Sequence, residues 1–227
     1  MARPAATSGK RTPLNRDRIF ATAIALADEH GIEAVSMRNV AQELDVVPMA
    51  LYKHVANKDE LLDGMIDVVV GTIDPVDDGE WKVAMRRRIL AARRAMRAHP
   101  WTSQVIESRT DATPAVLTYM DPMIGLFRSG GFSIDLTHHA MHVMGSRLLG
   151  FSQELFDDSS TPDPTPEMLE QMAVFPHISE LLLAITHDAS SVVGPGCDDQ
   201  FEFEFAVDLL LDGLERRRDL EGSPRGS

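Results

Sequence analysis

Apolar residues recur at helical spacing along most of this chain. Between Asn15 and His30 they fall three or four residues apart. The positions are Ile19, Ala23, Leu26 and Ala27, with Phe20 and Ile24 beside them. Asn15 or a neighbour can cap the start of this segment, and Gly31 can stop it. The pattern therefore predicts an amphipathic helix from about residue 15 to residue 30.

Residues 36–62 carry signals for three more helices in close succession. Ser36 is a suitable N-cap for a helix over 36–44, and residues 45–46 form a turn. Pro48 suits the first turn of a short helix that ends near Val55. Asn57 followed by Glu60 has the form of a capping box and opens another helix. Two short helices joined by a tight turn are typical of a helix-turn-helix.

A turn-rich break at residues 74–79 predicts a domain boundary, and helical periodicity continues beyond it. Further helices are predicted over about 80–98, from Trp101, over 114–130, 133–156, 166–187 and 199–218. The run FEFEF at 201–205 alternates as a strand would. Its phenylalanines also fall on two helical stripes, and no partner strand is evident, so we interpret it as helix.

These patterns predict an all-α protein with two helical domains. Residues 14–73 are expected to form a three-helix, helix-turn-helix DNA-binding domain, and residues 74–220 a larger ligand-binding and dimerisation domain. A basic arm at 1–13 and a tail at 221–227 are expected to be disordered.

Composition narrows the class of protein. No apolar run of about 20 residues is present, so no membrane contact is expected. Cys197 is the only cysteine and the N-terminus has no apolar signal region, which favours a cytoplasmic protein. The formal net charge is −13, yet residues 1–60 carry equal numbers of acidic and basic side chains. The net acid therefore lies away from the predicted DNA-binding domain, where it suppresses non-specific docking.

The second helix of a helix-turn-helix enters the major groove with its N-terminal side chains toward the bases. The outward residues of this segment are Val47, Pro48, Met49, Ala50, Tyr52, Lys53 and His54, while Leu51 and Val55 face inward. Val47, Pro48 and Ala50 can contact thymine methyl groups, and Lys53 can reach a guanine. Tyr52 and His54 suit phosphates. Ser36, Arg38 and Lys58 lie at helix N-termini, which favour phosphate. The alternative is a simple helical corner with solvated charges.

The stretch GIEAVSMRNVAQEL followed by DVVPMALYKHVANKDELL resembles the DNA-binding domain of the tetracycline-repressor (TetR) family. The resemblance is strong over about 14–72 and weaker through Gly79–Trp81 and Ala98–Trp101. It implies an all-helical homodimer that represses transcription and releases operator DNA when a small molecule fills the C-terminal domain.

The same resemblance places the drug and metal contacts of the tetracycline repressor on Asp74, Arg88, Ala92 and Ile106. None reproduces the expected His, Asn, Phe and His chemistry. Binding of a tetracycline–magnesium complex is therefore not expected, and the effector class stays open.

Candidate residues for effector binding are Trp101, Met120, Phe127, His138, His142, Arg147, Phe151 and His177. Arg147 lies among apolar neighbours, where it can meet an anionic ligand or an acid of a second subunit. His138 and His142 are four residues apart and can share a metal, but a third ligand is not identifiable. No metal or cofactor is therefore predicted. Plain core packing is the alternative for each apolar candidate.

Two patterns suggest a dimer. The seam over 133–156 alternates spacings of three and four, and the helix over 199–218 is apolar on two sides. The candidate interface residues are Met141, Met144, Leu148, Leu155, Phe201, Phe205 and Leu209. An ordinary intramolecular core seam is the alternative. The arginines over 86–97 are interpreted as a solvated face offset by acids.

The chain has no glycine-rich phosphate loop, HExxH or GxSxG motif, so it is not expected to be an enzyme. We expect a ligand-responsive homodimeric repressor whose partners are a pseudopalindromic double-stranded operator, a second copy and a small-molecule effector. An activator on the same scaffold, or a small-molecule carrier whose head contacts protein, are the alternatives.

Overall fold

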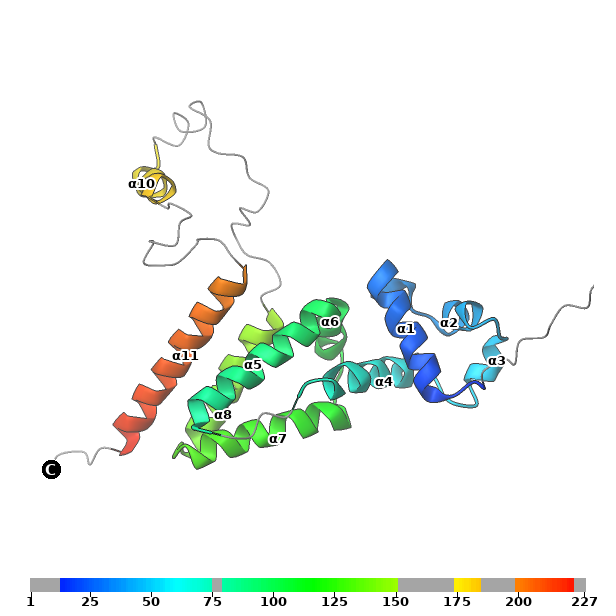
Figure 1. The fold of residues 1–227 in the computed structure, drawn as a ribbon, viewed down its shortest axis with the longest axis horizontal. Helices are drawn as coiled ribbons and strands as arrows, with labels where there is room; N and C mark the ends of the chain where they lie inside the picture. Colours follow the sequence, from blue (N-terminus) through cyan, green and yellow to red (C-terminus); the bar gives the residue numbers. More distant parts are fainter. Residues whose placement is uncertain (1–12, 75–78, 151–173, 185–198, 223–227) are drawn as a thin grey trace, which may run out of the picture. The chain divides into compact units, whose positions relative to one another are not determined.

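The computed structural model describes residues 13–74, 79–150, 174–184 and 199–222. Within these ranges all regular structure is helical, which confirms the predicted all-α class. The first part contains α1 (Arg16–His30), the 3₁₀ turn η1 (Ile32–Ala34), α2 (Met37–Glu43), α3 (Pro48–Leu51) and α4 (Lys58–Gly71). The rest contains α5 (Trp81–Ala98), α6 (Trp101–Glu107), α7 (Pro114–Ser129), α8 (Ile134–Gly150), α10 (Pro176–Ala184) and α11 (Asp199–Gly222) (Figure 1).

The helices group into two compact units. The N-terminal unit comprises Met1–Pro75 and Ala91–Pro122, and the C-terminal unit comprises Val76–Leu90 and Met123–Ser227. Helices α5 and α7 each contribute residues to both units. Residues 91–122, which we assigned to the larger domain from the sequence, thus pack in one unit with the helices of the predicted DNA-binding domain. Among the described residues, no helix combines the length and apolar character needed to cross a membrane.

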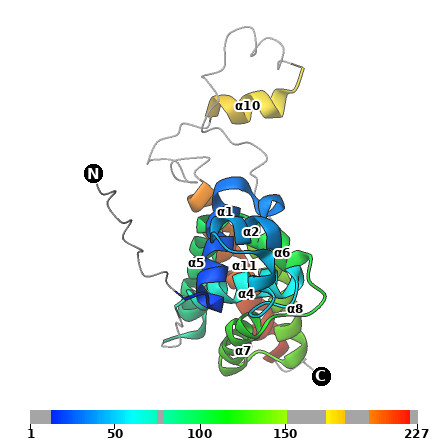
Figure 2. The ribbon, with the colours of Figure 1, turned by 90° about the vertical axis from the view of Figure 1, so that its right-hand side faces the viewer.

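In the N-terminal unit, α1 packs against both α2 and α4 (Figures 1 and 2). Their facing side chains form one buried cluster with Val35, Leu51 and Val55. Its helical members include Ile19, Ala23, Val40, Leu61, Met65 and Ile66. Burying one such side chain contributes roughly 1.5–3 kcal/mol, so this cluster is the main source of stability in the unit.

The helix ends of this unit are capped where the sequence predicted. The side chains of Asn15, Ser36 and Asn57 accept hydrogen bonds from Arg18, Asn39 and Glu60 N–H, at 2.9, 3.1 and 2.8 Å. Gly31 ends α1 with a φ of 79°, a conformation that glycine adopts without strain. These caps satisfy backbone donors that a helix start leaves unpaired.

Helix α6 and the start of α7 are tied to α1 and α4 by polar contacts. Trp101 Nε1 donates to Asp28 at 2.7 Å, and His99 Nδ1 lies 2.9 Å from the same carboxylate. Arg109 pairs with Asp59 at 3.0 Å and with Asp63 at 3.1 Å. In addition, Ala115 N–H donates to Asp67 at 3.1 Å. Because all these residues belong to the N-terminal unit, α6 is part of the same packed body as α1 to α4.

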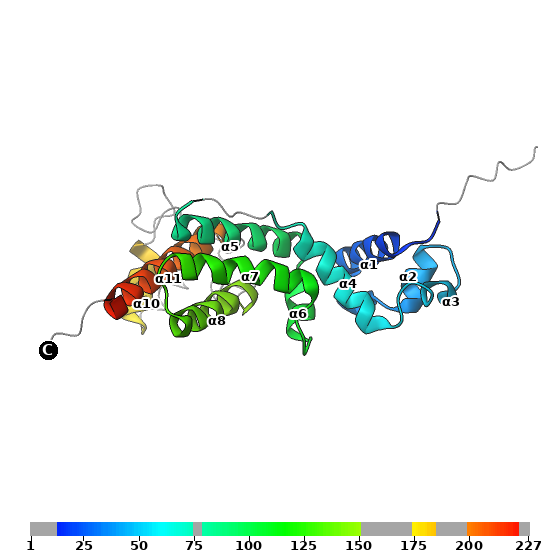
Figure 3. The same cartoon turned by 90° about the horizontal axis from the view of Figure 1, so that it is seen from below.

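The C-terminal unit has an aromatic core where α5 begins and α7 ends. The ring of Trp81 lies 4.7 Å from Phe132 and 5.9 Å from Phe127, centroid to centroid. The Arg218 guanidinium of α11 lies 5.6 Å from the Trp81 ring, a cation–π contact. Helix α11 lies beside α8 (Figure 3) and buries Phe203, Val207 and Leu211. The helical interpretation of residues 201–205 is therefore confirmed.

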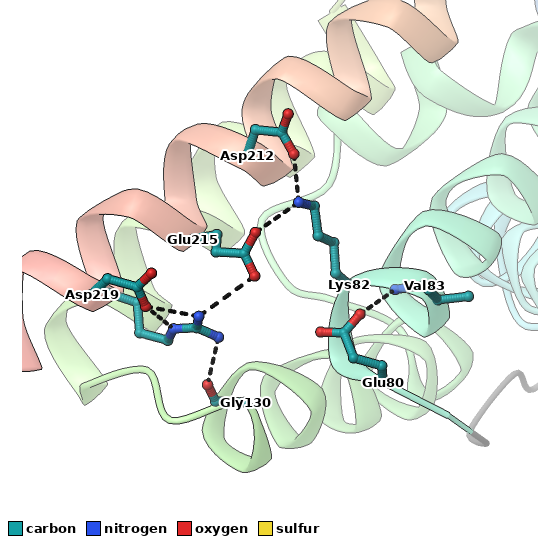
Figure 4. Close-up of polar contacts among 8 residues, drawn as sticks. Glu80, Lys82, Val83, Gly130, Asp212, Glu215 and Asp219 are labelled. Carbon is teal, nitrogen blue, oxygen red and sulfur yellow. Dashed lines mark hydrogen bonds and ion pairs between the residues drawn. The ribbon is translucent and has the colours of Figure 1, made fainter.

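Ion pairs join α5 to α11 within the C-terminal unit (Figure 4). Lys82 Nζ lies 2.5 Å from Asp212 and 2.8 Å from Glu215. Hydrogen bonds to these two carboxylates raise the pKa of Lys82 to about 12, and the lysine in turn lowers the pKa of Asp212. Arg218 extends the network to Glu215, Asp219 and the Gly130 carbonyl.

The arginines of α5 do not form the solvated face that we expected. Arg86 pairs with Glu204 at 2.7 Å and with Asp208 at 2.6 Å, and these hydrogen bonds raise its pKa. Arg88 and Arg93 are buried. The prediction of solvation was wrong for Arg88 and Arg93, whereas acids of α11 do offset the charge of Arg86.

Candidate nucleic-acid interface

A left-handed residue makes the tight turn between α2 and α3. Asp45 has a φ of 54°, Val46 N–H donates to Ala41 O at 2.9 Å, and Asp45 N–H donates to Gln42 O at 3.0 Å. This pair of bonds is a Schellman motif, which satisfies the last carbonyls of α2. Among residues other than glycine, aspartate is one of those that adopt the left-handed conformation most readily. The turn allows α3 to leave α2 at an angle.

The segment that follows presents its side chains to solvent as predicted. Val47 is 67% exposed, Met49 is 69% exposed and Tyr52 is 46% exposed. Pro48 and Lys53 are exposed too, while Ala50 and His54 are half-buried. Leu51 and Val55 are fully buried against the core, as the pattern indicated. An exposed row that is mainly apolar, with one lysine and one tyrosine, suits the base edges of a major groove.

The regular part of this helix is shorter than predicted. Helix α3 ends at Leu51, so Tyr52, Lys53 and His54 lie in the turn after it. The N–H groups of His54 and Val55 both donate to Leu51 O, at 2.8 and 2.9 Å. Such a bifurcated end tightens the last turn and ends the regular helix. Residues 47–54, which we call the reading segment after the role predicted for them, thus form one helical turn followed by a tight bend.

Three of the predicted phosphate ligands, Ser36, Arg38 and Lys58, lie at helix N-termini. Ser36 caps α2 and is half-buried, whereas Arg38 in the first turn of α2 and Lys58, the first residue of α4, are exposed. At these positions the free backbone N–H groups and the positive end of the helix dipole strengthen the attraction of each cation for a phosphate.

Comparison with known proteins decides the family. Residues 19–65 match the model of bacterial regulatory proteins of the tetR family, and residues 75–218 match the tetracyclin repressor-like C-terminal domain. The chain belongs to the TetR family. Members of this family are transcriptional regulators, so the predictions of a DNA-binding regulator and of a non-enzyme are confirmed. The alternative of a carrier whose head contacts protein is not supported.

Several relatives of this TetR-family regulator extend over most of its length. It is 30% identical to the HTH-type transcriptional repressor DrrR1 of Streptomyces coeruleorubidus, over 91% of this chain and 79% of DrrR1. It is 26% identical to the class C tetracycline repressor of Escherichia coli, over 90% of this chain and 92% of that protein. Among solved structures it is similar to apo ActR from Streptomyces coelicolor, with a TM-score of 0.71, 27% identity, and coverage of 93% and 99%. ActR has also been solved in complex with (S)-DNPA and with actinorhodin.

The candidate effector residues of this TetR-family regulator belong to both units. Trp101 is buried in the N-terminal unit, where its indole N–H bonds Asp28, and Met120 belongs to the same unit. Phe127 is fully buried in the aromatic core of the C-terminal unit. Phe151 lies outside the described residues. Trp101 and Phe127 are thus both buried, and their role in effector binding stays a prediction.

The polar candidates lie on helices of the C-terminal unit. The rings of His138 and His142 are 4.6 Å apart on an exposed face of α8, and His177 is exposed on α10. Among the described residues no three potential ligands converge on a metal position. Arg147 is half-buried, with its guanidinium carbon 5.1 Å from the centre of the Phe203 ring.

The dimer candidates divide between interior and surface. Met144 is buried within its own chain, and Met141, Leu148 and Phe201 are half-buried. Phe205 and Leu209 of α11 are exposed, at 43% and 57%. Leu155 lies outside the described residues. The α8 seam thus serves partly as intramolecular core, which was the stated alternative.

Sequence reasoning missed a groove of about 510 Å³ between α8 and α11. It is lined by Asp135, Leu136, His139, Val143, Leu209, Leu210, Gly213, Leu214, Arg217 and Glu221. Only Leu209 was among the predicted interface residues. The signal was available, because Asp135, His139 and Val143 are spaced four residues apart and share one face of α8.

Proposed function

We propose that this TetR-family regulator is a homodimeric repressor that binds a pseudopalindromic operator and is released by a small-molecule effector. The observation that carries this proposal is the exposed segment from Val47 to His54, held over a buried Leu51 and Val55. Apolar side chains left in water contribute nothing to stability. A major groove offers them thymine methyl groups and base edges to contact.

Each outward side chain has a role suited to its chemistry. Val47, Pro48 and Ala50 would contact thymine methyl groups, and Lys53 would donate to guanine acceptors. Tyr52 would bond a phosphate, together with Arg38 and Lys58 at the two helix N-termini. The apolar contacts and Lys53 would supply sequence preference, and the phosphate contacts would set the register of the helix on the duplex.

A dimer follows from the operator geometry that we propose. Two reading segments must meet successive half-sites about 34–36 Å apart, or a near multiple. The groove between α8 and α11 supports a second copy as its occupant. Its apolar floor includes Val143 and Leu209, and it carries both acidic and basic groups, Asp135 and Glu221 beside His139 and Arg217. A surface with both signs of charge can be complementary to itself across a two-fold axis.

Effector release rests on the relatives and on the contacts of α6. ActR, which is similar along nearly the whole chain, binds small molecules in its solved complexes. In this chain, Trp101 joins α6 to α1, and Arg109, two residues after the end of α6, pairs with Asp59 of α4. A ligand that favours another position of α6 would therefore favour another position of the reading segments. Because Arg88 and Ala92 are buried in place of drug-binding side chains, we expect an effector other than tetracycline–magnesium.

DNA binding by purified protein tests the proposal. The probe is a duplex selected from a randomised pool by the wild-type protein, with a scrambled duplex of equal length beside it. We expect binding of the selected duplex to fall steeply with salt, as phosphate contacts require. Tyr52→Ala and Lys53→Ala should each weaken it by roughly 10-fold, the effect of losing one good contact. Arg94→Ala, which removes an exposed cation from α5, is the control.

Selection of no duplex, or binding that ignores salt, would refute the function. Full affinity in the Tyr52→Ala, Lys53→Ala double variant would refute the proposed docking of the reading segment.

A further inference from the structure

Arg16, the first residue of α1, contacts two segments that are distant in sequence. Its Nη1 donates to the His54 carbonyl at 2.7 Å and lies 2.5 Å from Glu60 Oε1. Its guanidinium carbon also lies 5.2 Å from the Phe20 ring, whose side chain is buried. The guanidinium is thus anchored on α1 and joined to the end of the reading segment and to the first turn of α4.

Glu60, in the first turn of α4, holds the loop over residues 54–57 at a second point. Its second oxygen, Oε2, accepts the Ala56 N–H at 2.6 Å, while its own N–H donates to Asn57 Oδ1 at 2.8 Å. In a capping box the glutamate would return to the N–H of the cap residue, but here it reaches one residue further back. The Ala56 hydrogen bond, followed by Arg16, lowers the pKa of the Glu60 carboxyl. The loop over 54–57 is therefore held by Arg16 at its first residue and by Glu60 at its third.

The reading segment has few other constraints. Helix α3 has four residues and no side-chain hydrogen bond at its N-cap. Tyr52 and Lys53 lie beyond its end and point to solvent, and only Leu51 and Val55 fix the segment to the core. The backbone bonds from His54 and Val55 N–H to Leu51 O close the bend, and the side-chain bonds to the His54 carbonyl and to Ala56 N–H tie the bend and the loop after it to α1 and α4.

We propose that Arg16 and Glu60 are positioning residues for DNA reading, which hold the bend at residues 52–56 so that Tyr52 and Lys53 meet the duplex. This inference rests on the proposed function. Neither side chain needs to touch DNA. Arginine suits the task because its fork of fixed donors can serve a carbonyl and a carboxylate together, whereas lysine presents a single ammonium group.

The variant Glu60→Gln separates positioning from simple electrostatics. It removes one negative charge from a DNA-binding surface, so charge alone predicts tighter binding to any duplex. Positioning predicts the opposite for the selected duplex, because the amide loses the charge-assisted bonds to Arg16 and Ala56 N–H. We expect roughly 10-fold weaker binding to the selected duplex, as for the loss of one charged hydrogen bond, and unchanged or tighter binding to the scrambled one.

The control is Glu33→Gln, which removes an exposed acid from η1 in the same unit and should leave the ratio of the two affinities unchanged. Arg16→Lys keeps the positive charge and should still weaken the selected duplex in preference to the scrambled one. The double variant Arg16→Lys, Glu60→Gln should lose less than the product of the two single losses, since both act on one bend.

Thermal unfolding of each full-length variant accompanies the titrations. The inference is overturned if folded Glu60→Gln binds the selected duplex as tightly as the wild type or more tightly, or if both duplexes weaken equally. If Glu60→Gln does not fold, Arg16→Lys decides by the same ratio. A wild-type protein that selects no duplex would instead mark the failure of the proposed function.

Discussion

At the scale of single residues, Gly64 sets how closely α1 and α4 approach. A Cβ atom added at Gly64 would collide with the ring of Phe20, which is buried between the two helices. The same ring is the surface over which the Arg16 guanidinium lies. The space left by the absent side chain of Gly64 lets the Phe20 ring pack in the core, and the ring in turn positions the Arg16 guanidinium.

Gly64→Ala should destabilise the protein by about 1–3 kcal/mol, although alanine favours a helix more than glycine does, because overpacking outweighs propensity. Gly71→Ala is the matched control in the same helix, since a Cβ there meets no atom within 4 Å. It should leave stability unchanged or slightly raised. Urea unfolding followed by circular dichroism measures both. Equal midpoints for the two variants would show that the Phe20 ring moves aside freely.

A second residue-scale prediction concerns acid. The pKa of Glu60 is lowered in the folded state, so its contribution is present above the ordinary value of 4.5 and is lost as pH falls below it. Wild type should therefore be more stable than Glu60→Gln at pH 6, and the difference should shrink toward pH 3. Urea midpoints at the two pH values provide the measurement, and a constant difference would contradict the cause assigned to the shift.

At the scale of elements, the contact between α1 and α6 depends on one carboxylate. Asp28 near the end of α1 accepts from Trp101 Nε1 and lies beside His99. Together with the Arg109 pairs to α4, this carboxylate makes α6 part of the unit that contains the reading segment. Movement of α6 therefore acts on α1 and α4 through bonds, not only through apolar packing.

Asp28→Ala should cost about 1–3 kcal/mol, because the buried indole N–H of Trp101 loses its acceptor. Asp28→Asn retains an acceptor oxygen and should cost less. The neighbouring Glu29→Ala, on an exposed side chain, should change stability by no more than ~0.5 kcal/mol. Denaturant unfolding followed by Trp fluorescence ranks the three variants. A cost for Asp28→Ala no larger than that for Glu29→Ala would contradict the role given to this bond.

Much of the element-scale description could be predicted from the sequence, since it depends on local periodicity and caps. The N-caps Asn15, Ser36 and Asn57 and the buried Leu51 and Val55 are of this kind. Partners across space could not be predicted in the same way. Nothing local indicates that Glu60 reaches Arg16, 44 positions away, or that the Trp101 indole bonds Asp28. An apolar stripe such as that of Met144 predicts burial, but not whether its own chain or a second copy covers it.

At the scale of the whole molecule, the excess of acidic side chains lies outside the first 60 residues. Part of it faces the cations of α5 from α11, as the Arg86 and Lys82 pairs show. The first 60 residues remain balanced in charge. In the proposed docking, attraction for phosphate would therefore come from the positions of Arg38, Lys53 and Lys58 rather than from net charge.

The proposed dimer predicts a specific sensitivity of the groove. Leu209→Glu should give a monomer that no longer retains operator DNA, since burial of each leucine is worth roughly 1.5–3 kcal/mol and occurs twice in a two-fold interface. Leu220→Glu is the control, because Leu220 is also exposed on α11 but does not line the groove. Sedimentation velocity gives the mass of each variant. A Leu209→Glu protein that remains dimeric would place the interface elsewhere.

In the reading segment, the residues that anchor it to the core differ from those that face solvent, which bears on how such regulators acquire new target sequences. Only Leu51 and Val55 anchor it, so Val47, Met49, Ala50 and Tyr52 contribute little to the interior. Exchanges at these four positions should redirect the protein to new promoters while leaving its folding nearly untouched. A duplicated gene could acquire a new target by a few surface substitutions, and a library varied at these positions, scored separately for folding and for binding, measures that freedom.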